Sequence, residues 1–340
     1  NVAIGAYALD ANTTSNNNVA VGGLALTDNN GNSNVAVGYS ALEKNTSANN
    51  NTACGYKALE ANTSGTQNTA VGSSAGNDNT TGYNNIGDSA GASNTTGHHN
   101  TAVGRLAFNA NTTGDQNTAV GAEALQKTTG DSNTAVGYQA LEENTSGAQN
   151  IAIGPFALDS NTTANNNVAV GYLALQANST GTQNIAVGSN ALDANTTPNN
   201  NIAIGHDSLT DNTTGAENVA IGSNSLANNT TANSNTAVGF KSLEATTTGT
   251  ENVAIGARAL DEVTTANYNT AVGYVALSAS GNGSNNTAVG RAALNANTSA
   301  NNNTAVGYNA MLDNTTGDKN TAVGSLALDA NTTANNNTGI

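Results

Sequence analysis

Residues 133–154 read NTAVGYQALEENTSGAQNIAIG and contain one five-residue pattern twice. Asn-Thr-Ala-Val-Gly opens the stretch, and Asn-Ile-Ala-Ile-Gly follows seventeen residues later. The glycine that closes this pentad recurs twenty times, from Gly5 to Gly324, and sixteen of the nineteen spacings are 17 residues. A fixed period of this size predicts a repeat protein in which each turn stacks on the next. We therefore expect residues 1–340 to form a single continuous repeat array, and we number each repeat from the asparagine of its pentad (position 1).

The residue types within one repeat predict β-structure. Positions 2 and 4 are mostly Thr, Val or Ile, and position 3 is Ala in nineteen of twenty repeats. Such a run is typical of a short strand with positions 2 and 4 on one face and position 3 on the other. Position 9 is Leu in sixteen repeats, and positions 12 to 15 resemble Asn-Thr-Thr-Gly, a turn sequence. We expect an all-β, parallel β-solenoid of about twenty 17-residue coils, with two short strands in each coil.

The expected core comes from positions 4 and 9, and the expected turns come from position 5. The core residues are Leu9, Val21, Leu42, Val136, Leu141, Ile153, Leu158 and Leu192. The turn glycines are Gly5, Gly22, Gly137 and Gly154. Because stacked coils place identical residues above one another, we also expect ladders of Asn at position 1 and of Thr at positions 13 and 14.

Composition excludes several functional classes. The chain has a net charge of −15, and its eight basic residues are scattered, which argues against binding of nucleic acid. Only 9% of residues are charged and 4% aromatic, so the core must be thin. We find no apolar run long enough to span a membrane and no signal peptide. Cys54 replaces Val or Ile at position 4, which predicts a buried, unreactive thiol.

Candidate chemistry is sparse. The three histidines are His98, His99 and His206, and Asp88 and Asp115 are weak supporting ligands for a metal at the first pair. Aspartates at position 10 are expected to form a solvated edge: Asp10, Asp159, Asp193, Asp261 and Asp329. We therefore expect no catalytic, cofactor or metal site, and no enzyme.

Two recurring residue types allow a surface role. Six tyrosines at position 6 are candidates for surface recognition, or alternatively cover the edge of the core or a neighbouring chain: Tyr39, Tyr56, Tyr138, Tyr172, Tyr274 and Tyr308. Asn-x-Ser/Thr sequons recur at position 12, among them Asn12, Asn45, Asn62, Asn111, Asn144, Asn161 and Asn297. Glycans on successive coils would stand only about 5 Å apart, so a backbone role in the turn is the favoured interpretation of these asparagines.

The pentads, with Ala or Ser three residues after the glycine, resemble the head repeats of YadA-like trimeric autotransporter adhesins. The longer unit at 133–149 also resembles arrays in phage and virus tail-fibre proteins that end in an endosialidase-type chaperone. The resemblance covers the whole chain through one short motif. It implies a left-handed β-roll, three chains side by side, and a role at a surface. The repeat here is a few residues longer than in the adhesins, and no neck, stalk or anchor is present.

These observations favour a structural or adhesive rod of an extracellular appendage, filament or fibre, located at the cell or virion surface. Its expected partners are copies of itself, as a homotrimer or an end-to-end filament, and a host-surface or matrix ligand. The alternatives are a phage or virus tail-fibre shaft and an ice-binding solenoid, although the Thr columns are interrupted. Both ends lie in mid-pattern, so we expect a segment of a longer chain or filament.

Residues 73–99 depart from the pattern. Position 9 is Gly76 and then Gly91, and the spacing from Gly72 to Gly87 is 15 residues. We expect these irregular coils to be the least protected part of the array.

Overall fold

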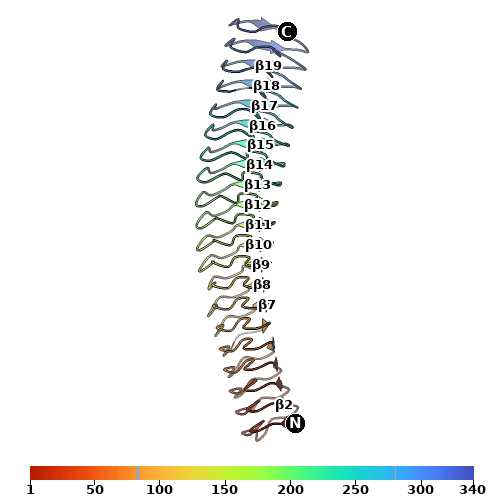
Figure 1. Ribbon diagram of the computed structural model, residues 1–340, viewed down its shortest axis with the longest axis vertical. Coiled ribbons are helices and arrows are strands. Elements are labelled where there is room, and N and C mark those ends of the chain that lie inside the picture. The colour runs from red at the N-terminus through yellow and green to blue at the C-terminus, as the bar shows by residue number, and fades with distance from the viewer. Residues whose placement is uncertain (82–84, 280) are drawn as a thin grey trace. The chain divides into compact units, whose positions relative to one another are not determined.

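The computed structural model describes residues 1–81, 85–279 and 281–340, and these residues contain strands and turns without a helix. The fold is a parallel β-solenoid of about twenty coils, and Figure 1 shows one strand in each labelled coil. The chain divides into two compact units, Asn1–Asn167 and Val168–Ile340, and each is a stack of such coils. The predicted fold class is thus confirmed. Residues 82–84 of the irregular segment lie outside the described residues.

Each strand occupies positions 2 to 4 of its coil, except β6, which occupies positions 3 and 4, and β21, which occupies positions 2 and 3. The strands of the first unit are β1 (Val2–Ile4), β2 (Val19–Val21), β3 (Val35–Val37), β4 (Thr52–Cys54), β5 (Thr69–Val71), β6 (Asn85–Ile86), β7 (Thr101–Val103), β8 (Thr118–Val120), β9 (Thr134–Val136) and β10 (Ile151–Ile153). Those of the second unit are β11 (Val168–Val170), β12 (Ile185–Val187), β13 (Ile202–Ile204), β14 (Val219–Ile221), β15 (Thr236–Val238), β16 (Val253–Ile255), β17 (Thr270–Val272), β18 (Thr287–Val289), β19 (Thr304–Val306), β20 (Thr321–Val323) and β21 (Thr338–Gly339).

Neighbouring strands within a unit pair in parallel, and identical positions lie opposite each other. In β9 and β10, for example, Ala135 lies opposite Ala152 and Val136 opposite Ile153. The 17-residue period therefore sets the register, because each coil presents the same backbone to the next. The shortened coil keeps this register, since Ala70 of β5 pairs with Asn85 of β6.

The second strand expected in each coil is not formed. Positions 6 to 11 form turns, and the residues at positions 7 and 9 have a left-handed backbone: φ is 54° at both Gln139 and Leu141. A strand requires an extended backbone, so this conformation excludes one. The chain instead reverses direction within a few residues, which carries position 9 back beneath the pentad.

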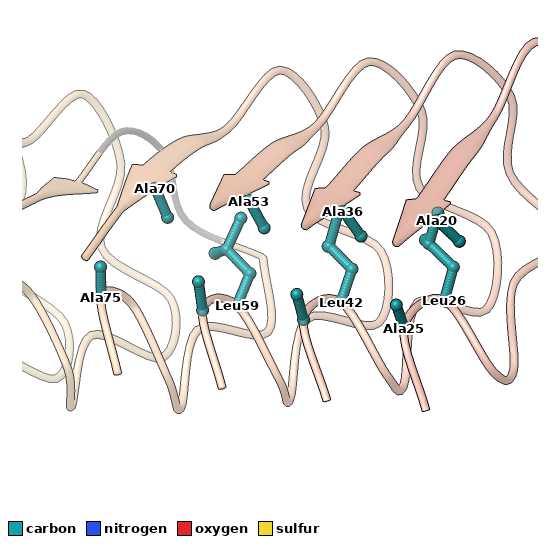
Figure 2. Packing of buried hydrophobic residues seen from close by; sticks show 11 residues of the cluster. Ala20, Ala25, Leu26, Ala36, Leu42, Ala53, Leu59, Ala70 and Ala75 are labelled. Atoms are coloured by element: carbon teal, nitrogen blue, oxygen red, sulfur yellow. The ribbon is translucent and has the colours of Figure 1, made fainter. Parts of the chain in front are cut away.

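The apolar half of each coil interior consists of small residues around one leucine. Figure 2 shows this packing, in which Ala20, Ala25 and Leu26 point into the same interior space. Position 3 is buried because its side chain points inward, and positions 8 and 9 close the space from the opposite side.

Five of the eight predicted core residues lie inside. Leu42, Leu141, Leu158 and Leu192 are fully buried, and Leu9, in the first coil, is partly buried. The three predicted core residues at position 4 are corrected: Val21 is only partly buried, and Val136 and Ile153 are 36% and 41% exposed. Because strand side chains alternate, an inward alanine at position 3 forces positions 2 and 4 outward.

The other half of the interior is polar and built from asparagine. The backbone N–H of Asn150 donates to Oδ1 of Asn133 one coil earlier at 3.0 Å, which forms the predicted ladder at position 1. A second ladder lies at position 12, where Nδ2 of Asn161 donates to Oδ1 of Asn144 at 2.8 Å. Nδ2 of Asn150 and Nδ2 of Asn161 both also donate to the carbonyl oxygen of Ala164. These bonds pair the buried amides along the stack and across the coil.

Glycine at position 5 is required for two reasons. Gly137 has a φ of 140°, which residues with a Cβ rarely adopt. A Cβ there would also lie 2.6 Å from the carbonyl carbon and oxygen of Gly154 in the next coil. Gly5, Gly22 and Gly154 share this conformation, as the predicted turn glycines.

Candidate interaction surface

The outer face of the strands is uncharged and partly exposed in both units. It is formed by position 4, which is Val or Ile except at Cys54, and by position 2, which is Thr in ten repeats and Val or Ile in nine. Its exposed members in the first unit include Val37, Val71, Val136, Ile151 and Ile153, and in the second unit Val187, Ile204, Ile221, Ile255 and Val323. We call these two columns the outer strand face. Adjacent members stand one strand spacing apart, about 4.8 Å, so position 4 presents a regular apolar column in each unit, beside a mixed column of Thr, Val and Ile at position 2.

Tyrosines at position 6 border this face. All six predicted recognition tyrosines are exposed, each between 45% and 52%. Tyr39 stacks on Tyr56 with ring centroids 5.9 Å apart. Tyr138 meets Phe156 of the next coil edge to face at 5.3 Å. Exposed aromatic side chains of this kind suit contact with a partner or ligand.

Cys54 is exposed, contrary to the prediction of a buried thiol. It belongs to β4 and occupies position 4, so the alternation that exposes Val136 also exposes Cys54. Cys54 does lie in the same environment as the Val and Ile residues at position 4 of the other repeats. That environment, however, is the outer strand face and not the core.

Most of the sequon asparagines at position 12 are buried in the folded coils. Of the seven asparagines considered, only Asn12 in the first coil is not fully buried. Nδ2, the atom that would carry a glycan, donates instead to neighbouring oxygens: in Asn62 it bonds Oδ1 of Asn45 at 3.1 Å and the carbonyl of Gly65 at 3.0 Å. The backbone interpretation of these residues is thus supported by their contacts.

The position-10 aspartates do not form a uniformly solvated edge. Asp261 is 9% exposed, and its Oδ1 accepts a short hydrogen bond from Oγ of Ser278. Burial and the nearby carboxylate of Glu143 raise the pKa of Asp159. Burial likewise raises the pKa of Asp193, although Oγ1 of Thr210 donates to its carboxylate at 2.7 Å. Position 10 faces partly inward because the preceding leucine enters the core.

The histidines and acidic residues of the described part of the chain do not gather into a metal-binding cluster. No three His, Cys, Asp or Glu side chains gather there in an arrangement that would hold a metal ion. The backbone N–H of His98 donates to Oδ1 of Asp115 at 2.7 Å, so this aspartate supports the stack of turns.

Charged pairs are local and scattered over the surface. Lys57 pairs with Glu60 and Lys241 with Glu244, each three residues apart in one coil. Arg105 and Glu123 form a pair between adjacent coils.

No protein-family model and no characterised protein matches this chain. Within residues 1–81, 85–279 and 281–340, no helix has the length and apolar character needed to cross a membrane.

Proposed function

We propose that the chain is a structural rod of an extracellular appendage or fibre, assembled from copies of itself through the outer strand face. The observation that supports this most directly is the exposure of that face on a parallel sheet. Parallel sheets are normally covered on both faces. Here alanine and leucine cover the inner face, whereas many of the Val and Ile side chains at position 4 remain exposed on the outer one.

The chemistry of the outer strand face suits a second copy of the chain. A partner needs an apolar array with the same spacing, and another copy supplies it. The chain carries a net charge of −15, yet positions 2 and 4 are free of charge, so copies can approach there without placing carboxylates in contact. An apolar array that continues over many coils is larger than the isolated patches of ordinary monomers. Closed symmetric assemblies are the common outcome, and the resemblance to adhesin heads implies a trimer.

The ice-binding alternative receives less support. Threonine at position 13 uses its hydroxyl within the stack: Oγ1 of Thr145 donates to the carbonyl of Thr162 at 2.9 Å. Position 2 interrupts its threonines with Val and Ile. Neither column is an unbroken threonine array. A thermal-hysteresis measurement separates this function from the structural one.

Sedimentation equilibrium of the whole chain tests the proposal. The unmodified chain is expected to sediment with a mass at least twice the 33.6 kDa of one chain, and three times that mass if it is a trimer. The double variant Ile204→Lys/Ile221→Lys places charges on the outer strand face and is expected to be monomeric. Its matched control is Thr214→Lys/Thr231→Lys, which changes exposed turn residues of the same two coils and is expected to assemble normally.

The accessibility of Cys54 gives a second readout. Its thiol should react slowly with a maleimide in the assembled chain and rapidly once the chain is monomeric. A chain that is monomeric at every concentration, or two double variants that assemble equally well, would show that the outer strand face is not the interface.

A further inference from the structure

Three residues at position 6 of successive coils form a cluster that the assembly does not require. We call Tyr274, Arg291 and Tyr308 the Tyr–Arg–Tyr cluster. The Arg291 guanidinium carbon lies 5.9 Å from the ring centroid of Tyr274 and 5.6 Å from that of Tyr308. Nη1 of Arg291 also lies 3.5 Å from the hydroxyl of Tyr308. The two rings hold the guanidinium between them, while both tyrosines remain about half exposed.

The charge around Arg291 differs from that of the rest of the chain. The chain has 23 acidic residues, but none lies between Glu262 and Asp313, and Arg291 is the one charged residue in that interval. No carboxylate in the described structure forms an ion pair with it. Arg105, at the same position in another coil, pairs with Glu123. Arg291 therefore presents a positive charge to solvent without a compensating anion.

These features indicate the chemistry of a ligand. A guanidinium matches carboxylate and sulfate groups through paired N–H donors. Exposed tyrosine faces are apolar platforms with a hydroxyl at one edge, suited to a ring that has apolar C–H faces and hydroxyl groups. Tyr274 and Tyr308 stand two coils apart, about 10 Å at the strand spacing, so they can contact separate rings of one extended chain. A saccharide with anionic groups combines both properties.

We propose that the Tyr–Arg–Tyr cluster binds an anionic saccharide, with pyranose rings on the two tyrosines and a carboxylate or sulfate on Arg291. This goes beyond the proposed structural role and does not depend on assembly. Nucleic acid is a poor candidate, because one arginine on an acidic chain cannot neutralise a run of phosphates.

Isothermal titration calorimetry of the whole chain at low ionic strength tests the site. The probes are an oligomer of uronic acid, a sulfated dextran, a neutral dextran of similar length and polyglutamate. Arg291→Gln is expected to weaken binding of the anionic saccharide at least tenfold, and Tyr274→Ala at least threefold. Arg105→Gln is the matched control, since it removes an exposed arginine from position 6 that already has a carboxylate partner, and is expected to change affinity less than twofold.

The probes distinguish the origin of the anionic group and the class of partner. Binding of the uronate alone, the sulfated dextran alone, or both supports the proposal and identifies the group that Arg291 recognises. No binding of either, equal binding of neutral dextran, or equal binding of polyglutamate would overturn it. Equal losses in Arg291→Gln and Arg105→Gln would overturn it as well, because the attraction would then be a general effect of charge.

Discussion

Leucine at position 9 combines a backbone cost with a burial gain. Leu141 has a left-handed backbone, which costs an L-residue about 1–2 kcal/mol. Full burial of its side chain stabilises the folded state by roughly 2–3 kcal/mol. The two glycines of the column, Gly76 and Gly91, have the same φ of 56° without that cost. Having glycine instead of leucine at these two positions therefore lowers the free energy of unfolding by less than the missing burial alone suggests.

Leu141→Ala is expected to destabilise the chain by about 2–5 kcal/mol, because it removes buried methyl groups and leaves a cavity. Gln139→Ala is its control, since Gln139 has the same left-handed φ of 54° but is only partly buried, and its Nε2 donates to the carboxylate of Glu123 at 2.9 Å. The control removes that one hydrogen bond and no core side chain, so it should change stability by no more than about 1 kcal/mol. Urea unfolding followed by circular dichroism measures both. Equal losses would mean that the inward and outward positions have been reversed.

Stability should also depend on the hydrogen bonds of the asparagine ladder at position 12. A substitution that removes these bonds but nearly keeps the side-chain volume tests this. Nδ2 of Asn212 donates to Oδ1 of Asn195 at 3.0 Å, and Oδ1 of Asn212 accepts from Nδ2 of Asn229 at 2.7 Å. Asn212→Leu removes both ladder bonds and the bond from Nδ2 to the carbonyl of Gly215 at 2.9 Å, so a cost of about 1–3 kcal/mol is expected in the same unfolding assay. Thr214→Ala, in the exposed part of the same turn, is the control. A neutral Asn212→Leu would show that the ladder contributes no net stability.

Asp159 provides a test in which pH is the variable. Its pKa is raised in the folded chain, first by burial and then by Glu143. Between the unfolded and folded pKa values the folded state binds more protons, so stability falls as pH rises through this window. Asp159→Asn should therefore raise the urea midpoint at pH 7, and the gain should disappear near pH 3, where both states are protonated. A gain that is the same at both pH values would indicate a packing effect.

At the scale of the element, the sequence predicted one strand correctly and one wrongly. The 17-residue period and the β-branched residues identify the pentad strand and its parallel pairing. The inward face was predicted wrongly for Val136 and Ile153, because large apolar residues were assumed to fill the core. In the structure, the inward-facing residue of the strand is the alanine at position 3. The leucine at position 9 fills the rest of the apolar interior, so no space is left there for a larger side chain. The left-handed conformation of positions 7 and 9 left no signal in the sequence, as leucine and glutamine rarely adopt it.

The polar interior was predicted only in part. Stacking of identical residues predicts the ladder at position 1, but the asparagines at position 12 resembled turn residues with accessible sequons. Their burial depends on the carbonyl at position 15, which collects two amide donors within one coil. Likewise, the exposed tyrosines were identified as candidate recognition residues from their recurrence at position 6, whereas the role proposed for Arg291 depends on its place between two rings.

The irregular coils allow a prediction at the same scale. The backbone bonds of their position-9 residues are intact: N–H of Gly76 donates to the carbonyl of Ala90, and N–H of Gly91 donates to the carbonyl of Ala107, both at 2.9 Å. What these coils lack is the buried side chain at position 9. Amides of 73–81 and 85–99 should therefore exchange with deuterium faster than those of 133–154, because local stability follows local burial. Gly76→Leu should slow the exchange. Equal protection of the two segments in the unmodified chain would show that other contacts replace the missing leucines.

At the scale of the whole molecule, the fold limits how far one change can act. Strands within a unit contact only the strands of adjacent coils. Stability is then a sum of individual coils and their interfaces, with little coupling over distance. A small globular domain that unfolds in one step shares one core and would lose protection throughout when a core residue is removed.

For the variant Leu141→Ala we therefore expect hydrogen exchange to change only locally. The coils at 117–132, 133–149 and 150–166 should exchange faster, because they contain the altered position or contact it directly. Residues 201–268 of the second unit should keep the exchange rates of the unmodified chain, since none of their interior contacts changes. Gln139→Ala serves again as the control and should leave all of these segments unaltered. Uniform acceleration along the chain would mean that the array unfolds as one cooperative unit, in which case the additive description of its coils is wrong.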